Sequence, residues 1–248
     1  MSGHSKWSTI KHKKAATDAK RAKIWSRIIR EITIAARGGS DPEGNPRLRA
    51  ALLSAKGANM PKDTVDKAVK RGAGELEGAV YEEITYEGYG PGGVAIMVET
   101  QTDNKNRTAA EVRHVFAKYG GKLGSTGCVG YLFERKGLIA IEDDKLDLDK
   151  VMEAAIEAGA EDVEEASGTI AVTTAMEDLH AVAGALNDAG IPVTRTELVL
   201  EAGTTVKVGE DDARALLRLI DFLDDLDDVS NVAANFDIDD EILSKLEG

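Results

Sequence analysis

Side chains that could bind phosphate are concentrated in the first thirty-seven residues of this chain. Lys and Arg bind a polyanion by releasing its counterions, and Trp and His rings can stack on exposed bases. Both kinds of side chain occur here, first in a short polar segment and then along one side of a predicted helix. The candidate contacts are Lys6, Trp7, Lys11, His12, Lys13, Lys14, Lys20, Arg21, Lys23, Arg27 and Arg30.

The charge of the chain divides sharply along the sequence. Residues 1–71 hold 17 Lys and Arg against 6 Asp and Glu, whereas the whole protein has a net charge of -13. A basic segment of this kind is typical of nucleic-acid binding and exceeds what solubility requires. Two other interpretations remain open at this stage: a solvated basic face, and a basic face that docks on the acidic half of the same chain.

A second polar segment lies between a predicted strand, 94–100, and a predicted helix. It contains Asp103, Asn104, Lys105, Asn106 and Arg107. In one interpretation this is a second contact loop, in which Lys105 and Arg107 meet phosphate or a protein partner. In the other, its side chains form Asx turns beside a capping box, Thr108 to Glu111, which would begin the helix.

Residue patterns typical of catalysis or metal binding do not occur. The single cysteine, Cys128, rules out an intramolecular disulfide, and the four histidines are scattered without ligand spacing. Segment 120–126 has the residue types of a phosphate loop in the wrong order, and the acidic segment 221–228 lacks the spacing of a calcium loop. We therefore expect no catalytic residue, no metal and no cofactor. An enzyme such as a nuclease ranks behind the binding functions.

The helix that carries the later basic residues is predicted from Lys20 to Arg37. Ile24, Ile28 and Ile32 fall on one side of a helical wheel, and the cations fall on the opposite side. A second helix should begin at Asn45-Pro46 and end at Gly57, and a third should follow Pro61 and end at Gly72. The basic segment thus predicts a helical N-terminal domain, residues 1–78, which includes a mobile arm, residues 1–19, and three helices after it.

The acidic remainder alternates strand and helix patterns. Residues 136–201 read in the order β-α-β-β-α-β, which is typical of a ferredoxin-like domain. Residues 79–135 form an incomplete unit, which residues 202–248 would complete. The last strand of residues 79–135 is predicted at 129–133, and the first strand of the ferredoxin-like domain at 138–141. The predicted fold class is α+β: an N-terminal three-helix domain followed by two ferredoxin-like α/β domains, one inserted in the other.

Several motifs in a fixed order resemble the YebC family of bacterial regulators, which includes the mitochondrial translational activator of cytochrome oxidase subunit one. The resemblance covers the whole chain. The motifs are Gly3-His4-Ser5-Lys6-Trp7, Lys11-His12-Lys13-Lys14, Asn59-Met60-Pro61, Lys70-Arg71-Gly72, Tyr86-Glu87-Gly88-Tyr89-Gly90-Pro91 and Thr102-Asp103-Asn104-Lys105-Asn106-Arg107-Thr108. The basic positions that the resemblance carries over are Lys6, Lys11, His12, Lys13, Lys14, Arg21 and Lys23.

The resemblance implies a three-domain cytoplasmic protein that acts in gene expression. Two partners are open: DNA, as in transcriptional regulation, and ribosomal RNA, as in a translation factor that acts on the ribosome, including at proline-rich stretches. The three helices present no set of base-reading side chains, which favours shape and backbone contacts. A ligand-sensing or protein-interaction module built on the ferredoxin-like domains is the alternative from another class. The oligomeric state is not predicted.

Overall fold

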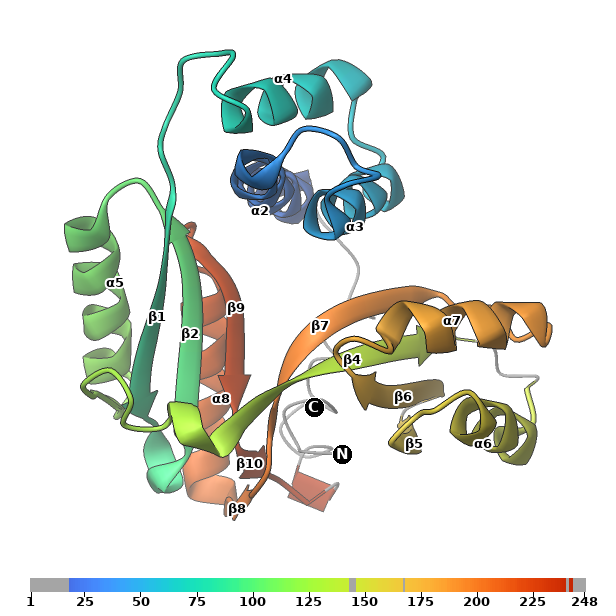
Figure 1. Cartoon of the computed structure of the whole chain (residues 1–248). Helices are drawn as coiled ribbons and strands as arrows, with labels where there is room; N and C mark the ends of the chain where they lie inside the picture. The colour runs from blue at the N-terminus through green and yellow to red at the C-terminus, as the bar shows by residue number, and fades with distance from the viewer. Residues whose placement is uncertain (1–17, 143–145, 167, 240, 243–248) are drawn as a thin grey trace.

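A helical domain and two four-stranded sheets with their helices are the main parts of the computed structural model, which describes residues 18–142, 146–166, 168–239 and 241–242 (Figure 1). The helical domain contains α2 (Asp18–Ala35), η1 (Ala36–Gly38), α3 (Pro46–Gly57) and α4 (Lys62–Gly72). Its aliphatic core is small, with Ile32, Leu48 and Ala68 at the centre. The Asn45 side chain accepts a hydrogen bond from the Leu48 amide, so the predicted N-cap of α3 is confirmed.

The first sheet is assembled from distant parts of the chain. Its order is β3 (Lys122–Leu123), β1 (Glu82–Tyr89), β2 (Ala95–Thr102) and β9 (Val229–Ala234), and every pairing is antiparallel. Two helices, α5 (Lys105–Lys118) and α8 (Glu210–Asp224), share one core with the sheet. Residues such as Val98, Phe116 and Leu219 are fully or almost fully buried there. Short segments η2 (Pro91–Gly93), β8 (Val206–Lys207) and β10 (Phe236–Asp237) lie at its end.

The second sheet has the strand order of a ferredoxin-like domain. Its elements are β4 (Phe133–Ile141), α6 (Leu148–Glu157), β5 (Asp162–Ala166), β6 (Thr169–Ala175), α7 (Leu179–Asp188) and β7 (Arg195–Ala202). The spatial order is β5-β6-β4-β7, and α6 and α7 contribute to its core. The predicted fold class, helical domain plus two α/β units, is confirmed.

Two local predictions are wrong. The sequence suggested separate strands at 129–133 and 138–141, but η3 (Gly130–Leu132) is followed by one continuous strand, β4. The charged residues between them pair with β7, and their side chains form ion pairs: Arg135 with Glu99, and Lys136 with Glu161. The predicted domain boundaries at 135/136 and 201/202 fall within this pair of strands and stay predictions. Helix α5 begins at Lys105 and not at Thr108, because Asn104 is its N-cap and accepts a hydrogen bond from the Arg107 amide.

Candidate nucleic-acid interface

Much of the predicted basic arm lies outside the described residues. These positions are Lys6, Trp7, Lys11, His12, Lys13 and Lys14. The side chains of Lys20 and Arg21 also lie outside the described part of the chain. The structure therefore places three of the predicted contacts, Lys23, Arg27 and Arg30, which project from α2.

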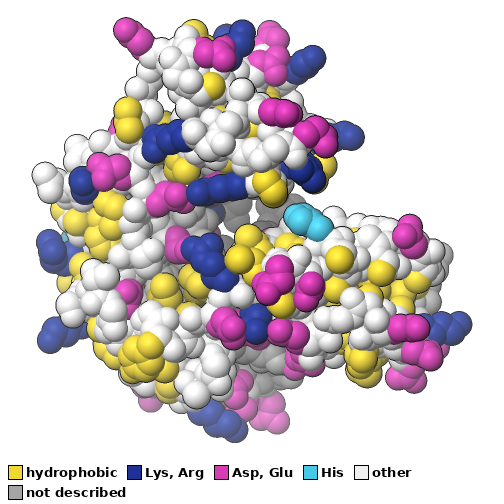
Figure 2. Space-filling view, viewed as in Figure 1, with side chains coloured by type: hydrophobic (Ala, Val, Ile, Leu, Met, Phe, Trp, Pro, Cys, Tyr) yellow, Lys and Arg dark blue, Asp and Glu magenta, His cyan; other side chains and the backbone are white. Residues whose placement is uncertain are grey.

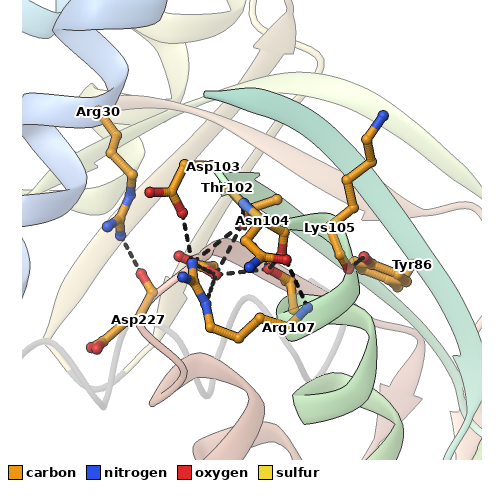
Figure 3. A network of polar contacts seen from close by, with 10 residues as sticks. Arg30, Tyr86, Thr102, Asp103, Asn104, Lys105, Arg107 and Asp227 are labelled. Carbon is orange, nitrogen blue, oxygen red and sulfur yellow. Dashed lines mark hydrogen bonds and ion pairs between the residues drawn. The ribbon is translucent and has the colours of Figure 1, made fainter. Parts of the chain in front are cut away.

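These three cations contact the end of α8 and the turn that follows it. Lys23 Nζ donates to the Asp224 carbonyl oxygen at 2.7 Å and to Asp225 Oδ1 at 3.1 Å. Arg27 Nη2 donates to Asp224 Oδ1 at 3.0 Å and also to the Asp224 carbonyl oxygen. Arg30 donates to the Asp227 carbonyl oxygen, as Figure 3 shows. One of the interpretations left open by the sequence was that the basic face docks on the acidic half of the same chain. These three side chains make such a contact.

Burial changes the electrostatics of this contact. It lowers the pKa of Lys23, and the neighbouring Arg27 charge lowers it further, against the opposite effect of Asp225. Burial also lowers the pKa of Arg30, although Asp228 and Asp227 oppose the shift. The Nε atoms of Arg27 and Arg30 are buried and donate to no acceptor within the described part of the chain. The guanidinium groups are thus only partly satisfied by the α8 end.

Other polar contacts hold the helical domain above the first sheet. Arg47 of α3 binds Glu31 at 2.7 Å and Glu83 of β1 at 2.6 Å, and the Gln101 amide donates to Glu31 at 2.5 Å. The two carboxylates raise the pKa of Arg47. Figure 2 shows Lys and Arg beside Asp and Glu where the helical domain meets the rest of the molecule. This junction is built from charges.

The opposite side of the helical domain keeps exposed cations. Lys62, Lys67, Lys70 and Arg71 of α4 are exposed and pair with none of the described carboxylates. Arg71 and Arg37 line a pocket of about 600 Å³ with Gly72, Gly74 and Gly78. The predicted site did not include these residues. Their signal was the helical spacing of Lys67 and Arg71, which places both on one side of α4.

The polar loop before α5 is tied to a buried carboxylate, Asp228. Asp228 Oδ2 accepts hydrogen bonds from Arg107 Nη2 at 2.7 Å, Thr108 Oγ1 at 2.7 Å and Thr102 Oγ1 at 3.0 Å. Burial alone would raise the pKa of Asp228, but these hydrogen bonds, that of Arg107 foremost, hold it below its usual value.

The two cations of this loop have local partners. Arg107 Nη2 also donates to Asp103 Oδ1 at 2.9 Å, and Lys105 pairs with Glu82 at 2.8 Å. Asn104 caps α5, and the Asn106 backbone belongs to the first turn of that helix. The interpretation of this loop as a supporting turn therefore has direct contacts in the structure, while its role as a contact loop stays a prediction.

A second buried carboxylate shapes the segment that joins the two sheets. Glu87 accepts hydrogen bonds from the backbone amides of Gly127, Val129 and Gly130 at 2.7–2.8 Å. Burial raises the pKa of Glu87, but the three amides together lower it by more, and the net pKa lies below the usual value. Amides of this segment therefore already bind a carboxylate of the protein.

No group of three or more His, Cys, Asp or Glu among the described residues is arranged to hold a metal ion. Within the same ranges, no helix combines the length and the apolar character that a membrane span requires.

Comparison with known proteins extends over nearly the whole chain. Residues 5–75 match the model of the TACO1/YebC protein N-terminal domain, and residues 81–236 match that of the TACO1/YebC second and third domain. A "probable transcriptional regulatory protein" of Acidithiobacillus ferrooxidans is 59% identical over 248 residues, which cover 100% of this chain and 99% of the relative. A protein of the same description from Desulfotalea psychrophila is 54% identical, with 99% of each chain covered.

A solved structure gives the same result. The crystal structure of the conserved hypothetical protein Aq1575 from Aquifex aeolicus matches with a TM-score of 0.87 at 50% identity, over 94% of this chain and 97% of that one. The relatives are named as regulators and not as enzymes.

Proposed function

Because the chain belongs to the TACO1/YebC family, whose relatives carry the name of probable transcriptional regulators, we propose that it regulates gene expression by binding nucleic acid with its basic N-terminal part. The observation that carries this proposal is the charge division: 17 cations against 6 carboxylates in residues 1–71 of a protein whose net charge is -13. The acidic domains repel a nucleic acid while the basic part attracts it, which orients the approach.

Two groups of side chains would meet the phosphates. One is the arm, with Lys6, Lys11, His12, Lys13 and Lys14; Trp7 would stack on a base there. The other is the exposed side of α4, with Lys67, Lys70 and Arg71. Helix α4 offers Lys, Asp and a single Arg in its last turn, and no Asn or Gln, so it lacks a set of base-reading side chains and its contacts would follow the backbone.

The partner we propose is ribosomal RNA within the ribosome, in the cytoplasm, with weakly specific duplex DNA as the other member of the same class. Binding by backbone and shape suits RNA, whose deep major groove excludes side chains.

Sedimentation of a cell lysate at physiological salt tests the proposal. Wild-type protein should migrate with ribosomes, and Lys13→Glu with Lys14→Glu should shift it to the free fractions. A matched variant, Lys122→Glu with Lys150→Glu, makes the same charge change at exposed positions of the acidic part and should still migrate with ribosomes. If wild-type protein does not migrate with ribosomes but binds duplex DNA, a role in transcription would be favoured over one in translation. Absence from both would contradict the proposal.

A further inference from the structure

We propose that Lys23, Arg27 and Arg30 form a phosphate-binding surface that the acidic end of α8 covers in the unbound protein, and that nucleic acid displaces this end. The inference rests on the proposed function and adds a mechanism that controls it. A basic face covered by the protein's own carboxylates binds with lower apparent affinity, because the fraction of open molecules limits binding.

The α8 end presents to α2 the kind of acceptors that a nucleic-acid backbone presents. Lys23 binds the Asp224 carbonyl oxygen at 2.7 Å and the Asp225 carboxylate at 3.1 Å. Arg27 binds the Asp224 carboxylate at 3.0 Å and the same carbonyl, and Arg30 binds the Asp227 carbonyl. The three cations recur at intervals of four and three residues, and so they form one stripe along the helix. Phosphate oxygens accept hydrogen bonds from the same guanidinium and ammonium groups.

The acidic residues are placed where helix electrostatics disfavour them. A helix C-terminus carries partial negative charge and favours Lys or Arg, yet α8 has no basic residue in its last turn and is followed by Asp225, Asp227 and Asp228. Asp228 is explained by its buried network with Arg107. Asp224 and Asp225 instead face the cations of α2. The charges of α2 compensate for an arrangement that α8 alone would not favour.

The contact between the α8 end and the α2 cations leaves some hydrogen-bond donors unsatisfied, and it is polar. Two donors, Arg27 Nε and Arg30 Nε, are buried without an acceptor among the described residues, and phosphate oxygens could satisfy them. The apolar cores of the helical domain and of the first sheet are separate clusters. The connecting residues 73–80 are all exposed and run as an extended arc from α4 to β1 (Figure 1). Separation of the two surfaces would therefore expose little apolar area.

Neutralisation of the acidic end tests the inference. Asp224→Asn with Asp225→Asn keeps the α8 carbonyls, removes the two carboxylates that bind Lys23 and Arg27, and favours the helix dipole. The control, Glu153→Gln with Glu157→Gln, makes the same charge change on the exposed side of α6. Affinities of the full-length proteins are measured for a structured RNA and for a DNA duplex of equal length, at fixed salt. The acidic-end variant should bind about three- to tenfold more tightly than the control.

The two proposals fail in different ways. If wild type binds and the acidic-end variant binds no more tightly than the control, the cover is refuted and the proposed function stands. If no form binds either nucleic acid, both are refuted.

A double-mutant cycle tests the surface itself. In a Lys23→Gln and Arg27→Gln background, neutralisation of Asp224 and Asp225 should give no gain in affinity for nucleic acid. A full gain in that background would overturn the assignment of the covered surface to α2.

Discussion

Arg107 and Asp228 lie 121 residues apart in the sequence, yet Arg107 Nη2 donates a hydrogen bond of 2.7 Å to Asp228 Oδ2. The pair joins the first turn of α5 to the residue before β9, so it connects the two separated parts of the first α/β unit. The Asp228 side chain is 8% exposed, whereas Arg107 is 44% exposed. The carboxylate therefore depends on its three donors, while part of the guanidinium stays in water.

Asp228→Asn should lower the free energy of unfolding by about 1–3 kcal/mol, because it removes a buried charge from its hydrogen-bond donors. Asp103→Asn is the matched variant, since Asp103 binds the same guanidinium at 2.9 Å but is 44% exposed. Its expected cost is below about 0.5 kcal/mol. Urea denaturation measures both, and equal losses would show that the buried position of Asp228 is unimportant.

Glu87→Gln should loosen the segment between the two sheets. One amide oxygen replaces two carboxylate oxygens that accept from three backbone amides, so a loss of about 1–3 kcal/mol is expected. Hydrogen exchange should accelerate at Gly127, Val129 and Gly130. Glu134→Gln, at a side chain that is 74% exposed, is the control. Unchanged exchange at all three amides would contradict this role.

Acid should destabilise the protein through these same two carboxylates. Their pKa values are lowered in the folded state, so their stabilisation is present above the unfolded carboxyl pKa of about 4 and is lost as the pH falls through the folded values. The free energy of unfolding should therefore fall on acidification, and less steeply in the Asp228→Asn and Glu87→Gln variants. Parallel curves for wild type and both variants would exclude this cause.

Gly72 permits the close approach of α4 to α2. A Cβ atom at this position would lie 2.3 Å from the Thr33 carbonyl oxygen and 2.6 Å from Ala36 Cβ. Gly72→Ala should cost about 1–3 kcal/mol through overpacking of the helical domain. Gly57→Ala, at the end of α3, meets nothing within 4 Å and should be neutral or slightly stabilising. Thermal unfolding that ranks the two variants in the opposite order would refute this packing account.

Local signals predicted the helices of the N-terminal domain well. The Asn45-Pro46 start and the Gly57 and Gly72 ends act within a few residues, and the structure reproduces them. The start of α5 was missed because Asn104 and Thr108 are both good capping residues, and the bond from the Arg107 amide to Asn104 decides between them. Strand β4 was missed because its charged middle resembles a loop until β7 is paired beside it.

The partner of the α2 cations could not be predicted from their pattern. Carboxylates and phosphates accept the same hydrogen bonds from Lys23, Arg27 and Arg30, so helical spacing alone does not distinguish them. The structure adds the nearby end of α8, which the sequence places about 200 residues away. The exposed cations of α4 can be identified as a candidate surface only from the structure, which distinguishes the cations that pair with carboxylates from those that do not.

The central claim, nucleic-acid binding by the basic N-terminal part, is tested most directly by the salt dependence of affinity. Binding of the full-length protein to purified ribosomes should weaken steeply with salt, and the log-log slope should become shallower by about 0.7–0.9 for each phosphate that a variant no longer neutralises. Lys13→Glu with Lys14→Glu should lower both the affinity and the slope, whereas Lys122→Glu with Lys150→Glu should change neither by a comparable amount. Affinity that is independent of salt, or equal in the two variants, would contradict the account.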